Sequence, residues 1–98
     1  MIFEWDPQKN KSNFNKHKVT FEEAETVFDD INAVYAPDKS HSVGEERFIV
    51  IGITEDLEKK LTVCHCHRGD NGDIIRIISA RRATKREIKF YEEGFYES

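Results

Sequence analysis

The sequence predicts a small α+β domain with about four antiparallel strands, two N-terminal helices and one C-terminal helix. Helix-start patterns near residues 6, 20 and 84 predict the helices. Segments rich in β-branched residues, all lying between the second and third helix starts, predict most of the strands. The 98 residues are enough for one domain and too few for two, so we expect residues 1–98 to form one unit.

The N-terminal segment predicts a short strand followed by a helix. Residues 3–5 alternate apolar and polar side chains, as an edge strand does. Asp6 followed by Pro7 is typical of a helix N-cap with proline at the first helical position. Residues 8–18 are polar except for one phenylalanine, so we expect this helix to be mostly exposed.

A second helix is predicted after Thr20. Thr20 and Glu23 form a capping box, in which the hydroxyl and the carboxylate each satisfy a free backbone N–H. Apolar side chains follow at helical spacing and predict one buried face: Phe21, Ala24, Val27 and Phe28. We expect the helix to end at the Asp29-Asp30 pair, because these charges oppose the negative end of the helix dipole.

The middle of the chain predicts strands. Residues 33–36 form a short candidate strand, and residues 47–54 are apolar on both faces, as in a central strand. Residues 61–67 and 74–79 follow after turns short enough for antiparallel hairpins. Gly52, in the middle of a strand, indicates a bulge or a close backbone approach.

The C-terminal segment predicts the last helix. Thr84 and Glu87 repeat the capping-box pattern, and Ile88 and Tyr91 continue it at helical spacing. The expected order is therefore strand, two helices, about four strands and one helix. We expect the helices to pack on one face of an antiparallel sheet.

The charges are unevenly distributed along the chain. The net charge of -4 disfavours a nonspecific nucleic-acid binder, which should be basic. Residues 19–58 hold eleven acids and two bases, whereas residues 59–90 hold nine bases and three acids. A second basic cluster lies near the N-terminus: Lys9, Lys11, Lys16 and Lys18. The average therefore conceals a possible positive face and a separate negative face.

The sequence also predicts a compartment. No apolar run approaches the length of a membrane span, and the first residues lack the basic start and apolar core of a secretion signal. Two cysteines, Cys64 and Cys66, provide no disulfide framework. We expect a reduced, cytoplasmic domain with no membrane partner.

Three separated blocks of the sequence, in order, resemble the BrnT toxin family. The first comprises F-E-W-D at residues 3–6 and V-T-F-E-E-A at residues 19–24. The second is H-S-x-x-E-E-R at residues 41–47, and the third is R-I-I-S-A-R at residues 76–81. The resemblance extends over residues 3–92. Each block alone is a weak signal, whereas the ordered combination is specific.

The resemblance implies a RelE-like fold and the activity of a ribonuclease toxin from a type II toxin–antitoxin pair. It also implies a ribbon-helix-helix antitoxin, similar to BrnA, as the partner. The complex would repress its own operon, and the toxin would reach operator DNA only through the antitoxin. RNA would be the substrate, and no cofactor is expected. The alternative is a catalytically weak binding module that holds the antitoxin and regulates the operon.

Metal-independent RNA cleavage requires a base, an acid and cations that stabilise charge on the phosphate. Arginine suits the last role because its planar fork grips phosphate and stays charged. The candidate catalytic residues are Arg68, Arg81, Arg76, His41 and Glu45. The candidate RNA-binding residues are Arg47, Lys16, Arg82 and Lys85.

Each candidate also has a structural alternative. Arg76 would share a strand face with Ile78 and Ala80, so it either pairs with a carboxylate or points into a polar groove. The carboxylates considered for that pair are Glu45 and Glu46. Arg47 could pair with neighbouring carboxylates and His41 could cap a surface turn. The remaining basic candidates could be exposed charges, and those of the last helix could contact the antitoxin.

The run Cys64-His65-Cys66-His67 does not predict a metal site. In a strand both cysteines face one side and both histidines the other, so one straight strand cannot place four ligands around zinc. We expect the cysteines to be small core residues. His65 should be a semi-buried histidine with a hydrogen-bond partner.

Overall fold

A computed structural model describes residues 1–97, with five β-strands and three α-helices in that range. The strands are β1 (Ile2–Glu4), β2 (Val34–Pro37), β3 (Phe48–Ile53), β4 (Lys60–Arg68) and β5 (Ile74–Arg82). The helices are α1 (Pro7–His17), α2 (Phe21–Thr26) and α3 (Lys85–Glu93), with short 3-10 turns η1 (Val27–Asp29) and η2 (Lys39–His41). No helix in residues 1–97 is both long enough and apolar enough to cross a membrane.

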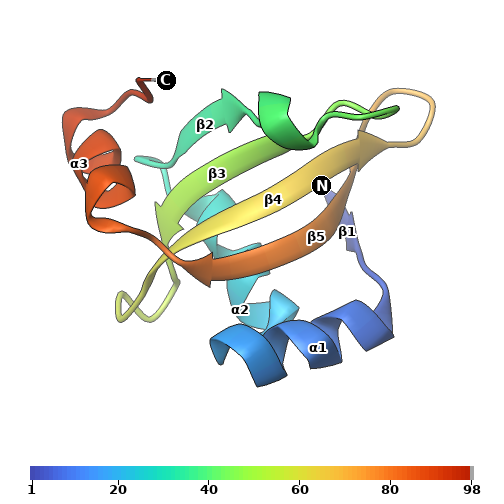
Figure 1. Cartoon of the computed structure of the whole chain (residues 1–98), viewed down its shortest axis with the longest axis horizontal. Helices are drawn as coiled ribbons and strands as arrows, with labels where there is room; N and C mark the ends of the chain where they lie inside the picture. Colours follow the sequence, from blue (N-terminus) through green and yellow to red (C-terminus); the bar gives the residue numbers. More distant parts are fainter. Residues whose placement is uncertain (98) are drawn as a thin grey trace.

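The strands form one mixed sheet in the order β1-β5-β4-β3-β2 (Figure 1). The predicted hairpins β3–β4 and β4–β5 are antiparallel, and β2 also pairs antiparallel with β3. The edge strand expected at residues 3–5 is confirmed as β1. The prediction of an antiparallel sheet of about four strands was wrong there, because β1 joins the sheet as a fifth strand and runs parallel to β5. Two helices separate β1 from the next strand, so no local turn fixed its direction or its neighbour.

The predicted helix starts are confirmed. Asp6 accepts a hydrogen bond from the Gln8 N–H at 2.9 Å, with proline at the first position of α1. Complete capping boxes begin α2 and α3. The α-helical part of α2 ends at Thr26 and the turn η1 continues to Asp29, close to the predicted end.

The two faces of the sheet are covered differently. Helices α1 and α2 pack on one face, where the buried core lies: Val19, Phe21, Ala24, Val27, Val50, Leu61, Val63, Ile75, Ile77 and Ala80. The prediction that all helices share this face was wrong. The side chain of Thr62 lies on the face opposite the core, because its neighbours Leu61 and Val63 point into the core. Glu87 of α3 accepts a hydrogen bond from this Thr62 side chain. Helix α3 therefore covers one end of the second face, and no other helix of residues 1–97 packs on it (Figure 1). We refer to the second face as the open face.

A β-bulge in β5 decides which of its side chains reach the open face. Cys64 pairs with Ser79 and His65 pairs with Ile77, so Ile78 has no partner on β4. The predicted face containing Arg76, Ile78 and Ala80 was therefore wrong. Ala80 is buried in the core, whereas Arg76, Ser79 and Arg81 lie on the open face.

Gly52 of β3 is a site of close approach, one of the two possibilities that the sequence offered. A Cβ at this position would lie 3.1 Å from both the Cβ and the carbonyl oxygen of Val27. We expect Gly52→Ala to lower the free energy of unfolding by about 2 kcal/mol, because η1 would have to move away from β3. Urea denaturation measures this change, with Ser12→Ala on the exposed side of α1 as the control. Equal stabilities of the two variants would contradict the close contact.

Candidate active site

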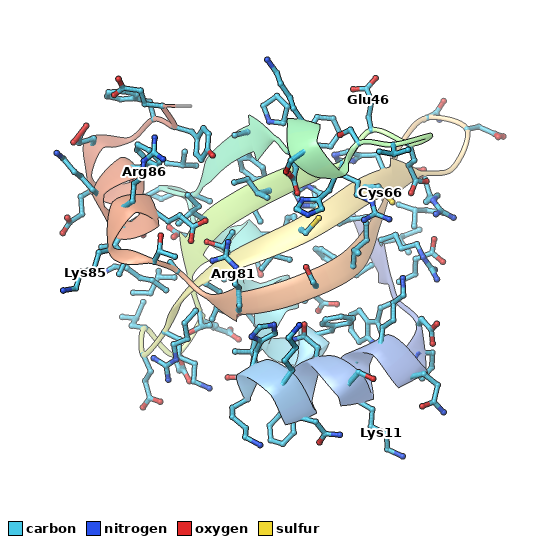
Figure 2. All side chains as sticks on the ribbon, viewed as in Figure 1. Lys11, Glu46, Cys66, Arg81, Lys85 and Arg86 are labelled. Atoms are coloured by element: carbon cyan, nitrogen blue, oxygen red, sulfur yellow. The ribbon has the colours of Figure 1, made fainter. Side chains whose placement is uncertain are left out.

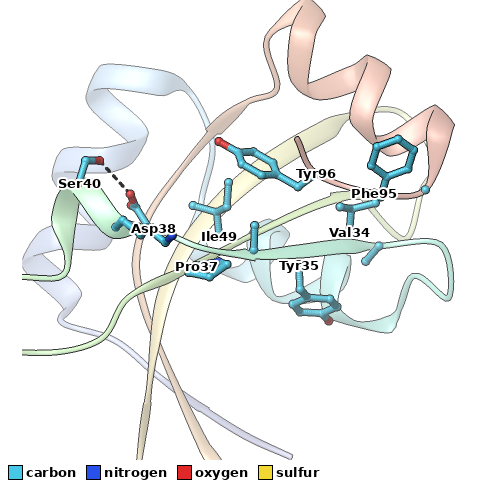
Figure 3. A pocket seen from close by; sticks show the side chains of 12 residues that line it. Val34, Tyr35, Pro37, Asp38, Ser40, Ile49, Phe95 and Tyr96 are labelled. Carbon is cyan, nitrogen blue, oxygen red and sulfur yellow. Dashed lines mark hydrogen bonds between the residues drawn. The ribbon is translucent and has the colours of Figure 1, made fainter. Parts of the chain in front are cut away.

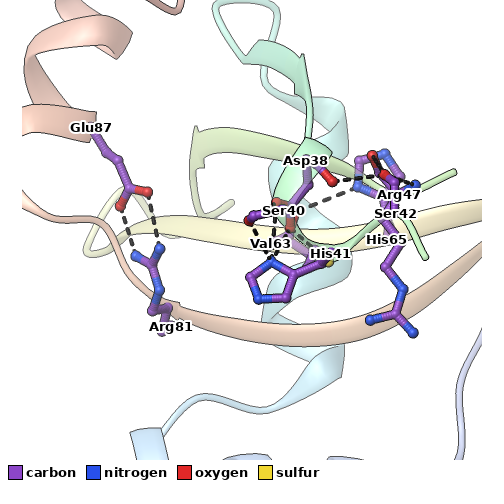
Figure 4. Close-up of polar contacts among 10 residues, drawn as sticks. Asp38, Ser40, His41, Ser42, Arg47, Val63, His65, Arg81 and Glu87 are labelled. Carbon is purple, nitrogen blue, oxygen red and sulfur yellow. Dashed lines mark hydrogen bonds and ion pairs between the residues drawn. The ribbon is translucent and has the colours of Figure 1, made fainter. Parts of the chain in front are cut away.

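The open face of the sheet contains a cavity of about 150 Å³ between β3, β4, β5 and the loop that follows β2. Three of the residues predicted from the sequence line it: His41, Arg47 and Arg81. Asp38, Thr62, Cys64 and Ser79 add polar groups to its wall. The strands supply a rigid floor, and the loop that contains η2 brings Asp38 and His41 over it (Figure 4).

Asp38 and His41 form a hydrogen-bonded pair at the edge of this cavity. His41 Nδ1 lies 2.9 Å from Asp38 Oδ2, and because an ionised carboxylate only accepts, Nδ1 is the donor. Burial raises the pKa of Asp38, but hydrogen bonds from His41 and Ser40 outweigh it and hold this pKa below its ordinary value. The Asp38 side chain is 15% exposed and that of His41 is 66% exposed. Asp38 therefore stays ionised and orients the imidazole, and Nε2 remains available for proton transfer.

Arg47 supplies a cation to the same cavity. Its backbone is fixed by the loop, since its N–H donates to Ser42 Oγ at 3.0 Å and its carbonyl accepts from the Asp38 N–H at 2.8 Å. The expected alternative, an ion pair with a neighbouring carboxylate, is not formed within residues 1–97. The guanidinium of Arg47 is therefore free to bind an anion beside His41.

Arg81 is already held by a carboxylate. Its two terminal nitrogens donate to the two carboxylate oxygens of Glu87 at 2.7 and 3.0 Å (Figure 4). Burial raises the pKa of Glu87, but the hydrogen bonds from Arg81, the Thr84 N–H and the Thr62 hydroxyl lower this pKa by more than burial raises it, to about 2. The bidentate pair joins α3 to β5, so Arg81 has a structural contact in addition to any role toward RNA.

The low pKa of Glu87 predicts a pH-dependent contribution to stability. The contribution is fully present above the ordinary pKa of about 4.5 and is lost as the pH falls toward 2. We expect Glu87→Gln to lower the free energy of unfolding by about 2 kcal/mol at pH 7, and the difference from wild type should shrink below pH 4. Urea denaturation across this range measures it. A difference that does not change with pH would contradict the ion pair.

Two other predicted arginines are paired away from the cavity. Arg68 Nη2 lies 3.0 Å from Glu45 Oε2, so these two predicted catalytic residues contact each other. Arg76 Nη1 lies 3.3 Å from Glu4 Oε2. The expected partner of Arg76, Glu45 or Glu46, was wrong because the parallel pairing of β1 with β5 aligns Glu4 with Arg76.

Comparison with known proteins assigns this chain to a family. The sequence model of the ribonuclease toxin BrnT, of type II toxin–antitoxin systems, matches residues 5–87. The chain belongs to the BrnT family. Among the solved structures, the crystal structure of the Brucella abortus ribonuclease toxin BrnT is similar, with a TM-score of 0.64 and 24% sequence identity. That match covers 87% of this chain and 100% of the Brucella chain, and it shows that the two share a fold. No curated protein sequence matches significantly.

The other basic residues predicted to bind RNA lie outside the cavity of this BrnT-family chain. Lys16 belongs to α1, which covers the opposite face of the sheet. Arg82 and Lys85 are exposed at the end of β5 and the start of α3, and neither lines the cavity. Figure 2 shows Arg81 over the open face and Lys85 directed away from it. Their roles toward RNA or a partner stay predictions.

The Cys/His run of this BrnT-family chain alternates as predicted. Cys64 and Cys66 face one side of β4 and His65 faces the other. Cys66 is buried as expected, whereas the expectation of a core residue was wrong for Cys64, which is half-buried and lines the cavity. His65 is 1% exposed rather than semi-buried, because it packs against the rings of Phe28 and Phe48, and burial lowers its pKa to about 4. Burial is also the main cause that raises the pKa of Cys64 to about 11. No cluster of three metal-binding side chains occurs in residues 1–97.

Sequence reasoning missed Asp38 as a member of the site. The residue lies in an acid-rich stretch and does not stand out by its type. The available signal was its spacing, because Asp38 and His41 are three residues apart and one 3-10 turn brings such residues onto one side.

Proposed function

We propose that this BrnT-family chain is an endoribonuclease. Cleavage takes place in the cavity of the open sheet face and needs no metal ion. The proposal rests on one observation: His41, oriented by Asp38, lies at the edge of a cavity that also contains the guanidinium of Arg47, which pairs with no carboxylate of residues 1–97. A proton-transfer group beside a phosphate-binding cation supplies the base and the cation of this reaction, and the protonated imidazole or water then serves as the acid. The assignment to a family of ribonuclease toxins supports RNA as the substrate.

The proposed reaction uses the 2′-hydroxyl of RNA as the nucleophile. His41 Nε2 accepts its proton, and the 2′-oxygen attacks phosphorus. The bond to the 5′-oxygen breaks, and that oxygen leaves with a proton from the imidazolium or from water. The products are a 2′,3′-cyclic phosphate and a 5′-hydroxyl. Arg47 donates to the non-bridging phosphate oxygens, on which negative charge accumulates in the transition state.

The partner and the compartment belong to the same proposal. The family is of type II, which implies an antitoxin. We expect a ribbon-helix-helix protein that neutralises the toxin, represses the operon together with it and provides the only contact with operator DNA. We expect the pair to act in the cytoplasm.

Expression in a bacterium tests the proposal. We expect growth arrest with RNA degradation when the chain is expressed alone, relieved by co-expression of the adjacent open reading frame. Arg47→Ala should lower the cleavage rate of the purified chain about 100-fold, because it removes the phosphate ligand. Arg76→Ala removes an arginine of the same face that pairs with Glu4, and it should leave the rate within about twofold. Equal losses in both variants would contradict the proposed role of Arg47.

A second candidate function is a binding module with weak catalysis. The observation in its favour is that Arg68, Arg76 and Arg81 each pair with a carboxylate, in a chain of net charge -4. Such a surface attracts RNA weakly. Normal growth and intact RNA in cells that contain folded chain would favour this candidate.

A further inference from the structure

A second and larger cavity lies on the open face beside the proposed active site. Its volume is about 600 Å³, and it is lined by residues 33–40, Ile49 and residues 94–96 (Figure 3). Its floor is formed by β2 and β3, and the segment that follows α3 forms its other side. We refer to this cavity as the β2 groove.

The β2 groove exposes the features that bind an extended peptide. The Phe95 side chain is 53% exposed, and Tyr96 projects over Ile49 on the floor of the groove (Figure 3). In residues 1–97, no strand pairs with the outer side of β2, which is the edge of the sheet. Pro37 has no N–H, so it limits the edge that can pair to residues 34–36. Apolar pockets along an open strand edge are a recurrent mode of peptide recognition.

The charges around the β2 groove indicate which peptide fits. The charged side chains that line the groove are Asp38 and Lys39. The surrounding surface is acidic: burial and the nearby carboxylates of Asp30 and Asp29 raise the pKa of the Tyr35 phenol. Glu92 lines the adjoining cavity together with Ala33 and Gly94. Lys89 pairs with Glu93, and Arg86 contacts the backbone of Glu97, so these two bases of α3 reduce the acidic excess without cancelling it. This surface repels a phosphate backbone and attracts lysine and arginine side chains.

The β2 groove is continuous with the proposed active site. Asp38 and Ile49 line both cavities. A chain bound in the groove would therefore lie against the Asp38–His41 pair, where it would block the approach of RNA.

We propose that the β2 groove binds an extended, basic and apolar segment of the protein partner, and that occupancy of the groove inhibits RNA cleavage. The inference rests on the proposed function in one respect, since it takes the partner to be the antitoxin. On this account the antitoxin covers the β2 groove with a segment that carries basic and apolar side chains.

The test is an NMR titration of the full chain with a short synthetic peptide of alternating lysine and valine. We expect the backbone amides of Val34, Ala36 and Gly94 to shift, and the same peptide with glutamate in place of lysine to cause no shift. Phe95→Ala should weaken binding about tenfold. Phe14→Ala should not change it, because Phe14 is a comparably exposed phenylalanine on α1, across the sheet from the groove.

Three outcomes would overturn the inference. They are no shifts with the lysine peptide, shifts confined to other surfaces, and shifts at the groove caused instead by an uncleavable 2′-O-methyl RNA. The last outcome would make the groove a nucleic-acid subsite.

A parallel cleavage assay separates this inference from the proposed function. Intact cleavage without peptide binding overturns the inference alone, whereas peptide binding by a chain that cleaves no RNA overturns the proposed function alone.

Discussion

Replacing His41 by glutamine is expected to lower the rate of RNA cleavage by about 10²- to 10⁴-fold while leaving the fold intact. Glutamine can still donate to Asp38, but it cannot take up the proton of the 2′-hydroxyl. Because the His41 side chain is largely exposed, its loss removes little packing. Single-turnover cleavage of a labelled RNA measures the effect.

The matched control for this experiment is His17→Gln. His17 ends α1, which covers the opposite face of the sheet, so its replacement should leave the rate unchanged. A His41→Gln variant that cleaves at the wild-type rate would show that the proton acceptor lies elsewhere. Glu45 would then be the first alternative, because the sequence predicts it as catalytic and it lies at the other end of the same loop.

Replacing Asn13 by alanine is expected to lower the free energy of unfolding by about 3 kcal/mol. The Asn13 amide group donates to the carbonyls of Val19 and Ala80 at 2.9 and 2.7 Å, and its oxygen accepts from the Ala80 N–H at 3.0 Å. Removing the side chain leaves these buried backbone groups without partners.

Urea denaturation of Asn13→Ala and Asn15→Ala tests this role. Asn15 is an exposed asparagine of the same helix, so its replacement changes helix propensity by the same amount without breaking a buried bond. We expect only Asn13→Ala to shift the denaturation midpoint strongly. Equal shifts would show that Asn13 contributes through helix propensity rather than by joining α1 to β5.

The elements that could be predicted from the sequence are those that local chemistry determines. The caps at Asp6, Thr20 and Thr84 each satisfy backbone groups within three residues, so the pattern alone defines them. The hairpins follow from strand patterns joined by short turns. At Gly52 the sequence predicted either a bulge or a close backbone approach, and the structure shows the close approach.

The features that could not be predicted depend on distant partners. The parallel position of β1 pairs residues 2–4 with residues 74–76, and no pattern in either segment specifies the other. The bulge at Ile78 changes the faces of all later residues of β5. The adjacent apolar residues Ile77 and Ile78 interrupt the alternation in the sequence, but they do not show which residue lacks a partner on β4. Asn13 is one polar residue in a polar helix, so only the fold distinguishes it from its neighbours.

The candidate site shows the same division. His41, Arg47 and Arg81 could be selected by residue type, and the fold places all three around one cavity. Their partners could not be selected, because the contacts of Arg81 with Glu87 and of Arg76 with Glu4 depend on the position of α3 and the pairing of β1. The sequence therefore predicted the cations of the cavity, but not that Arg81 is paired with Glu87 while Arg47 pairs with no carboxylate of the described residues.

The most direct test of the proposed activity is cleavage of a defined RNA by the purified chain in the presence of excess EDTA. The proposed reaction predicts cleavage at an undiminished rate, with fragments that end in a 2′,3′-cyclic phosphate and begin with a 5′-hydroxyl. Cleavage that stops in EDTA and returns with a divalent cation would contradict it, as would fragments that carry a 5′-phosphate, because a water molecule rather than the 2′-hydroxyl would then be the nucleophile.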